Sequence, residues 1–159
     1  MNKLRVDLDL LLESFTFEKE GVCKEYLDTL TGEVINIPME VAEAVENYAD
    51  EEELEEWQRI LMEDAQAIYD DKDGRYLSIP TIQDEFSNKL IADFVNNLIN
   101  EEQLKEKFIK ILKGKNSVSA FRSELYNYPN LSDLWHDFEE QRLKDNIVQW
   151  LKAFDIEVI

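Results

Sequence analysis

The stretch VCKEYLDTLTGEVINIP, residues Val22 to Pro38, contains two strand-like runs separated by a short turn. The runs Val22–Asp28 and Glu33–Ile37 are rich in Val, Ile, Tyr and Leu, which are residue types enriched in β-strands. Between them, Gly32 ends the segment Thr29–Gly32 and can adopt the positive φ that a tight hairpin turn needs. The sequence therefore predicts a β-hairpin, and a purely helical fold is excluded.

Most of the remaining chain has the three-to-four-residue spacing of apolar side chains that is typical of helices. We expect helices at Leu4–Phe17, from Pro38 to about Tyr48, from Asp50 to about Ile68, from Thr81 to Leu98, from Asn100 to Gly114, at Val118–Tyr126 and from Asn130 to about Phe154. Their N-terminal caps are expected at Asp50, at Thr81 with Asp84, at Asn100 with Gln103 and at Asn130 with Asp133. Short extended segments are expected at Arg75–Pro80 and Glu157–Ile159. The prediction is an α+β fold, predominantly helical, with a small antiparallel sheet built on the hairpin, in one domain covering residues 1–159.

Two helix faces are predicted to lie in the core. The face of the helix that starts at Asp50 contains Leu54, Trp57, Leu61, Ala65 and Ile68. The last helix has a wide apolar arc, which contains Leu131, Leu134, Trp135, Phe138, Leu143, Ile147, Trp150, Leu151 and Phe154.

The chain is strongly acidic, with 36 Asp and Glu against 17 Lys and Arg and a formal net charge of −19 in 159 residues. Between Glu40 and Asp73 there are 14 acidic and two basic residues. Such a surface repels phosphates and anionic lipid headgroups, so nucleic acid and membrane are not expected partners. It attracts a basic protein, which is the partner class we expect. The lysines between Lys105 and Lys115 are expected to line the edge of a helix or to offset the negative charge of the acidic segment.

The sequence offers little material for catalysis or for a cofactor. No phosphate-binding loop, dinucleotide-binding or serine-hydrolase motif occurs. The lone cysteine, Cys23, cannot form an internal disulfide and is expected in the core. The segment Asp70–Gly74 resembles part of a calcium-binding loop, but alignment on Gly74 puts Pro80 where the bidentate glutamate should be. We therefore expect no catalytic residues, no metal site and no cofactor.

The location expected is the cytoplasm. Asp7 and Asp9 interrupt the leucines of the first twelve residues, which is not typical of a signal-peptide core, and no apolar run is long enough to cross a bilayer.

The last predicted helix contains the three residues that we single out as binding candidates, Trp135, His136 and Arg142. His136 is the only histidine and lies at the edge of the apolar arc. The alternative to a binding role is a structural histidine at the boundary between core and surface. Arg142 lies near the middle of that arc, where a guanidinium needs a partner. We expect a carboxylate from another helix within salt-bridge distance of Arg142; the alternative is a site for an anionic ligand.

Several segments resemble a bacterial family known as Uncharacterised Protein Family 0158. They are Tyr26–Asp28 followed by Thr31–Val34, Tyr76–Pro80, Phe121 and Leu125 before Tyr128-Pro129, and Trp135, Phe138, Arg142, Trp150 and Leu151. The family's Gly-Ala-Phe-Arg-Arg-Phe stretch appears as Asn116–Phe121, without the two arginines, which speaks against a basic site there. The resemblance implies a bacterial cytosolic protein and brings no known activity or cofactor.

Two functions remain open at this point. The absence of catalytic motifs and the gathered negative charge favour a non-catalytic module that binds or regulates another protein. The rival explanation of the charge is that it only keeps an abundant cytosolic protein soluble. The alternative is a metal-dependent hydrolase that uses Asp and Glu carboxylates on a small anionic substrate. The oligomeric state does not follow from the sequence.

Overall fold

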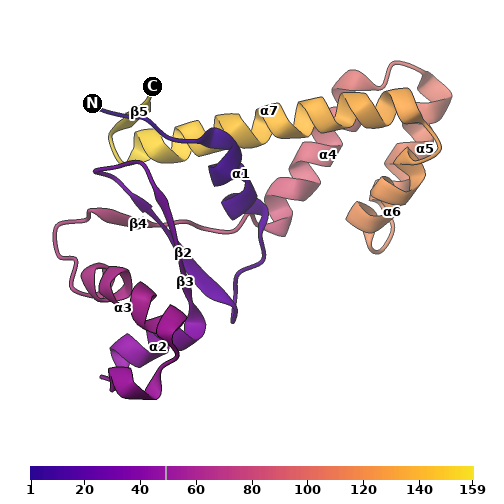
Figure 1. Ribbon diagram of the computed structural model, residues 1–159. Helices are drawn as coiled ribbons and strands as arrows, with labels where there is room; N and C mark the ends of the chain where they lie inside the picture. Colours follow the sequence, from indigo (N-terminus) through magenta and orange to yellow (C-terminus); the bar gives the residue numbers. More distant parts are fainter. Residues whose placement is uncertain (49) are drawn as a thin grey trace. The chain divides into compact units, whose positions relative to one another are not determined.

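The computed structural model of the protein describes residues 1–48 and 50–159 (Figure 1). The chain forms two compact units: unit 1 contains residues 1–81 and 147–159, and unit 2 contains residues 82–146. The helices are α1 (Leu8–Thr16), α2 (Met39–Glu46), α3 (Glu56–Tyr69), α4 (Asp84–Leu98), α5 (Glu102–Leu112), α6 (Ser117–Leu125) and α7 (Pro129–Ala153), with a 3-10 turn η1 (Glu51–Glu53). The strands are β1 (Asn2–Leu4), β2 (Cys23–Asp28), β3 (Val34–Pro38), β4 (Tyr76–Ser78) and β5 (Ile156–Val158). The predicted α+β, mainly helical fold class is confirmed, whereas the single domain stays a prediction.

The predicted hairpin forms the centre of unit 1. Strand β2 pairs with β3 in antiparallel register, and β4 pairs with the other edge of β2, so the sheet order is β3-β2-β4. Gly32 has a φ of +81°, and a Cβ at this position would collide with the carbonyl of Arg5. The turn therefore requires glycine both for its backbone angle and for its space.

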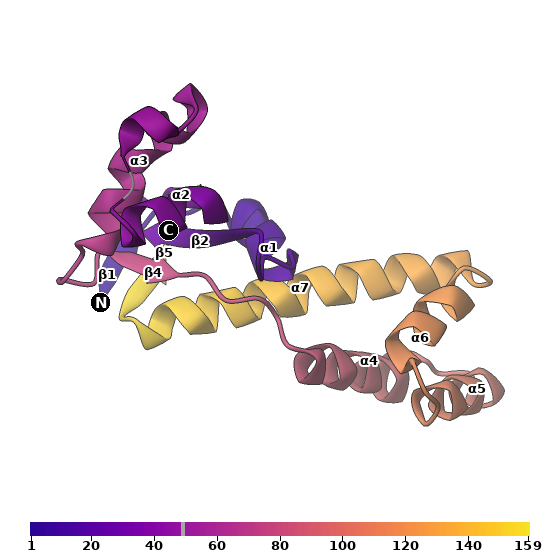
Figure 2. The ribbon, with the colours of Figure 1, turned by 90° about the horizontal axis from the view of Figure 1, so that it is seen from below.

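A second, two-stranded sheet corrects the predicted first helix. Leu4 belongs to β1, which pairs with β5 in parallel, and α1 begins only at Leu8. The carboxylate of Asp7 accepts hydrogen bonds from the backbone N–H groups of Asp9 and Leu10, both at 3.1 Å, and so caps α1. The expected terminal strand near Glu157 is present, and Figures 1 and 2 show that the two ends of the chain lie beside each other.

The acidic segment forms α2, η1 and α3. Figures 1 and 2 show α2 and α3 side by side next to the hairpin. Val41 and Val45 of α2, Ala65 of α3 and Ile37 of β3 form one buried cluster. The predicted start at Asp50 is wrong, because α3 begins at Glu56 with a capping box formed by Glu55 and Gln58, while Asp50 accepts a hydrogen bond from the N–H of Glu52 within the η1 turn.

The core of unit 2 is aromatic. Phe94 of α4, Phe121 of α6 and Trp135 of α7 are at most 3% exposed and meet edge to face, with ring centroids 4.9–6.2 Å apart. Phe108 of α5 is fully buried against Phe121. Such pairs add about 0.5–1.5 kcal/mol each beyond the burial of their surface.

Several predicted boundaries and core positions are wrong. The cap of α4 is Gln83 and that of α5 is Glu101, and the hydroxyl of Thr81 donates to the carbonyl of Phe17. Helix α7 starts at Pro129, which suits the first turn because proline lacks an N–H. Three side chains predicted in the core are 42–49% exposed: Trp57, Leu134 and Phe154.

No helix among the described residues is long and apolar enough to cross a membrane.

Candidate functional site

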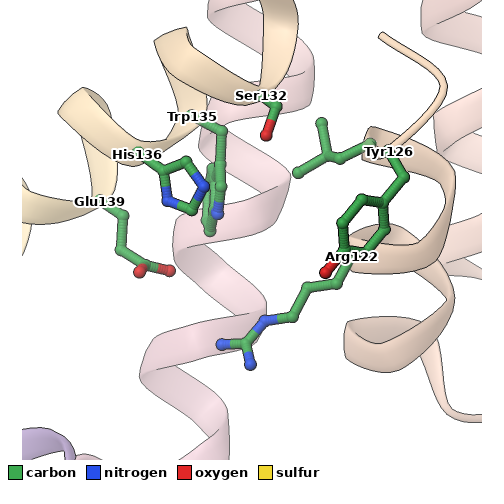
Figure 3. Close-up of a pocket in the computed structure, with 7 residues that line it drawn as sticks. Arg122, Tyr126, Ser132, Trp135, His136 and Glu139 are labelled. Carbon is green, nitrogen blue, oxygen red and sulfur yellow. The ribbon is translucent and has the colours of Figure 1, made fainter. Parts of the chain in front are cut away.

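A pocket of about 290 Å³ lies between α6 and the first half of α7, entirely within unit 2. Figure 3 shows Arg122 and Tyr126 on one side, and Ser132, Trp135, His136 and Glu139 from α7 on the other. Leu125 completes the lining. The pocket therefore combines an apolar floor with a cation, a carboxylate, two hydroxyls, an imidazole and an indole.

The polar side chains of this pocket do not pair with the protein. Within residues 1–48 and 50–159, no hydrogen bond or ion pair involves the side chains of Arg122, Tyr126, Ser132, Trp135, His136 or Glu139. The indole of Trp135 matters most, because the residue is only 3% exposed and yet lines the pocket. The indole N–H has no acceptor among the described residues and remains accessible, so a ligand in the pocket can accept a hydrogen bond from it.

Two of the three binding candidates, Trp135 and His136, line this pocket, and Arg142 does not. Trp135 also packs against Phe94 and Phe121, so its ring belongs to the core while one edge faces the pocket. His136 is exposed, at the rim of the pocket. The structure thus brings together the two neighbours in sequence and separates the third candidate from them.

Arg142 has the partner that the sequence predicts. Its guanidinium donates to the carboxylate of Asp93 on α4 at 2.9 Å and lies 5.4 Å from the ring centroid of Phe138. The two charged side chains are 35% and 32% exposed, so water screens the pair. This ion pair links α4 to α7 inside unit 2.

Replacing Arg142 by methionine should lower the free energy of unfolding by about 1 kcal/mol, because the pair is about one-third exposed and its loss does not leave a deeply buried carboxylate behind. Asp93→Asn should have a similar effect, and the double variant should lose less than the sum. Urea unfolding of the four proteins measures this coupling; strictly additive losses would show that the contact contributes nothing to stability.

The second surface of interest is the outward side of α3, which we name the α3 outer face and define as Glu56, Trp57, Ile60, Glu63, Asp64 and Ala67. The exposed apolar residues Trp57, Ile60 and Ala67 lie on one side of the helix and form an apolar ridge, with the carboxylate of Asp64 beside Ile60 and Ala67. Trp57 is 46% and Ile60 71% exposed. The indole of Trp57 donates to the carboxylate of Glu55 at 2.6 Å, which holds the ring against the start of α3.

The segment that contains this face is acidic, with 14 acidic and two basic residues between Glu40 and Asp73. Tyr69 lies at the end of α3, away from the outer face, and its pKa is raised, first by the neighbouring Tyr48 and then by desolvation and the nearby carboxylates of Glu46 and Asp70. Unit 2 differs, because it has 12 acidic and nine basic residues, whereas unit 1 has 24 and eight. The lysines of α5 contribute to this balance; Lys107 pairs with Glu124 of α6 at 2.7 Å and Lys105 donates to the carbonyl of Asn96.

The loop that resembles a calcium site has a structural role. The carboxylate of Asp71 accepts hydrogen bonds from the backbone N–H groups of Asp73, Arg75 and Tyr76, and the bond from Tyr76 is the main reason why the pKa of Asp71 is lowered. Cys23 is buried, as predicted, and its sulfur accepts from the amide of Asn36. No group of three or more His, Cys, Asp or Glu able to hold a metal is found in the described part of the chain.

Sequence reasoning missed Arg122 and Tyr126. They lie four residues apart in the predicted helix Val118–Tyr126 and therefore share a face, which was the available signal. Glu139 lies two turns after Ser132 and one turn after His136 but could not be distinguished among 36 acidic residues.

Comparison with known proteins decides the family. The model of UPF0158, described as an uncharacterised protein family, matches residues 1–159. The chain belongs to the UPF0158 family. The UPF0158 proteins of Chlamydia trachomatis and Chlamydia pneumoniae are 28% identical over 127 residues, which is 80% of this chain and 34% of each relative. The chain thus spans about a third of the length of these relatives.

A UPF0158 protein of Pseudomonas aeruginosa is 25% identical over 157 residues, which is 99% of this chain and 88% of that protein. No solved structure matches the chain. The residues that carry the UPF0158 resemblance are largely structural here, since Asp28 and Gly32 hold the hairpin turn while Phe121 and Trp135 fill the core of unit 2. Of the residues that carry the resemblance, Leu125 and Trp135 also line the pocket.

Proposed function

We propose that this UPF0158 chain is a protein-interaction module that binds a basic, amphipathic segment of a partner protein on the α3 outer face. The observation that carries the proposal is the pair of exposed apolar side chains, Trp57 and Ile60, set among the carboxylates of Glu56, Glu63 and Asp64. Single exposed apolar residues are common, but an apolar ridge edged mainly by carboxylates, with Arg59 as the cation on its flank, is typical of an interaction surface.

The two parts of the face have different roles. The carboxylates of the Glu40–Asp73 segment attract a basic partner from a distance and speed its association. The apolar ridge supplies the short-range part, since covering an exposed isoleucine side chain contributes about 2 kcal/mol. Amphipathic helices of partner proteins bind through apolar side chains that are spaced three and four residues apart, and Trp57 and Ile60 on this face are three residues apart. Binding that depended on charge alone would be non-specific.

A synthetic amphipathic peptide of lysine and leucine provides a defined probe. We expect Ile60→Ser to weaken its binding about tenfold or more, because the variant keeps every charge and loses one anchor. Leu30→Ser is the matched control, since Leu30 is also 71% exposed in unit 1 but lies in the hairpin turn. Fluorescence anisotropy of the labelled peptide measures both.

Added salt should weaken the peptide's binding to the wild type, and Ile60→Ser should remain weaker than the wild type at every salt concentration. Equal affinities of the Ile60→Ser and Leu30→Ser variants would overturn the proposal, because binding would then need only the negative charge of unit 1.

A further inference from the structure

The pocket between α6 and α7 presents two opposite charges that do not neutralise each other. Arg122 approaches from α6 and Glu139 from α7, and Figure 3 shows their charged groups pointing toward the space between the two helices. The two side chains form no ion pair with one another or with any other described residue. A ligand with one charge of each sign can satisfy both at once.

The other lining groups restrict the ligand further. Trp135 offers an indole N–H from a side chain that is 97% buried, and Figure 3 shows its nitrogen at the end of the ring nearer to Glu139 and Arg122. Tyr126 and Ser132 add hydroxyls, while Leu125 and the faces of the aromatic rings provide an apolar wall. The volume of about 290 Å³ is at the small end of ligand pockets, roughly 300–1,000 Å³, so the ligand must be small.

We propose that this pocket binds a free α-amino acid with an apolar side chain. The carboxylate of the ligand accepts charge-assisted hydrogen bonds from the Arg122 guanidinium and the Trp135 N–H. Its ammonium group pairs with the Glu139 carboxylate, and its apolar side chain contacts Leu125 and the Tyr126 ring. A residue at the end of a peptide has only one of the two charges next to its side chain, so the pocket discriminates against it.

The near balance of charge in unit 2 is compatible with such a ligand. A zwitterion has no net charge, so the acidic character of the whole chain does not repel it. This site is independent of the α3 outer face, because all its lining residues belong to unit 2 and those of α3 belong to unit 1.

The indole N–H resonance of Trp135 in a proton–nitrogen correlation spectrum tests the proposal. L-phenylalanine should shift this resonance saturably and leave that of Trp150, which packs on Phe15 in unit 1, unchanged. Two probes each lack one charge: 3-phenylpropanoate has no ammonium, and L-phenylalaninamide has no carboxylate. Each should bind at least about tenfold more weakly than L-phenylalanine.

Two variants test which pocket residue recognises which charge of the ligand. Arg122→Gln should remove the preference for L-phenylalanine over its amide, and Glu139→Gln should remove the preference over 3-phenylpropanoate. Glu106→Gln on the exposed side of α5 is the control and should change neither preference. The dispersion of the core resonances shows that each variant is folded.

Three results would overturn the proposal. They are no saturable shift of Trp135 with either L-phenylalanine or L-leucine at millimolar concentration, equal affinity for the amino acid and the singly charged probes, or unchanged preferences in both pocket variants.

Discussion

Replacing Lys19 by methionine should lower the free energy of unfolding by about 3 kcal/mol, the largest effect that we expect from one substitution outside the apolar core. Lys19 is 8% exposed and its ammonium group donates to the carbonyls of Ile79 and Pro80 and to the Ser14 hydroxyl, at 3.0–3.3 Å. It also lies 3.6 Å from the carboxylate of Glu25.

The loss is large because the variant leaves acceptors without a donor. The Glu25 side chain is 12% exposed, so in the variant its negative charge would remain shielded from water. The Ser14 hydroxyl would then be its remaining hydrogen-bond donor. The double variant Lys19→Met with Glu25→Leu should recover part of the stability. Lys24→Met is the control, because the pair of Lys24 with Glu46 is 44–51% exposed and should contribute less than about 1 kcal/mol. Urea midpoints that shift equally for Lys19 and Lys24 would contradict this account.

The second large effect concerns Asp28 at the end of β2. Its buried carboxylate accepts two hydrogen bonds from Arg75, at 2.8 and 2.9 Å, and one from the N–H of Leu30. The hydrogen bond from Arg75 is the main reason why the pKa of Asp28 is lowered from 3.8 to about 2. A difference of this size corresponds to about 2 kcal/mol of stability.

The sign of the pH dependence follows from the lowered pKa. The stabilisation by Asp28 is fully present above pH 3.8, where the carboxylate is ionised in both states, and is lost as the pH falls through about 2. Asp28→Asn should therefore be less stable at neutral pH by about 2 kcal/mol, and the difference from the wild type should shrink over this window. Chemical unfolding at a series of pH values measures it, with the exposed Asp73→Asn as control. A constant difference down to pH 2 would mean that the charge of Asp28 is not what stabilises the turn.

The parts of the fold that were predicted correctly are those specified by local sequence. Gly32 and the strand-forming residues around it indicate the hairpin, and the spacing of Leu90, Phe94 and Val95 indicates α4. Strand β1 has only three residues and is defined by its pairing with β5 at the other end of the chain, so no local pattern could reveal it. Asp50 and Glu55 are both acceptable caps, and the choice between them depends on packing.

The candidate sites also combine features that the local sequence indicates with features that depend on tertiary packing. Trp135 and His136 could be chosen from the sequence because tryptophan and histidine are rare in this chain, and the structure places both at the pocket. The exposure of Trp57 could not be foreseen, because it lies at the edge of the apolar stripe of α3, where a small rotation of the helix decides between core and surface. The pocket itself depends on the approach of α6 to α7, which is a tertiary property.

A photo-crosslinking amino acid placed at position 60 tests most directly whether a basic partner binds the α3 outer face. In lysate of the source bacterium, the benzoylphenylalanine variant of Ile60 should form a discrete adduct, and mass spectrometry should identify the crosslinked segment as rich in lysine and arginine. The same probe at Leu30 should not form it, and neutralising Glu56, Glu63 and Asp64 to their amides should abolish it. An adduct that forms equally from position 30, persists after neutralisation or contains an acidic segment would contradict the proposed interaction.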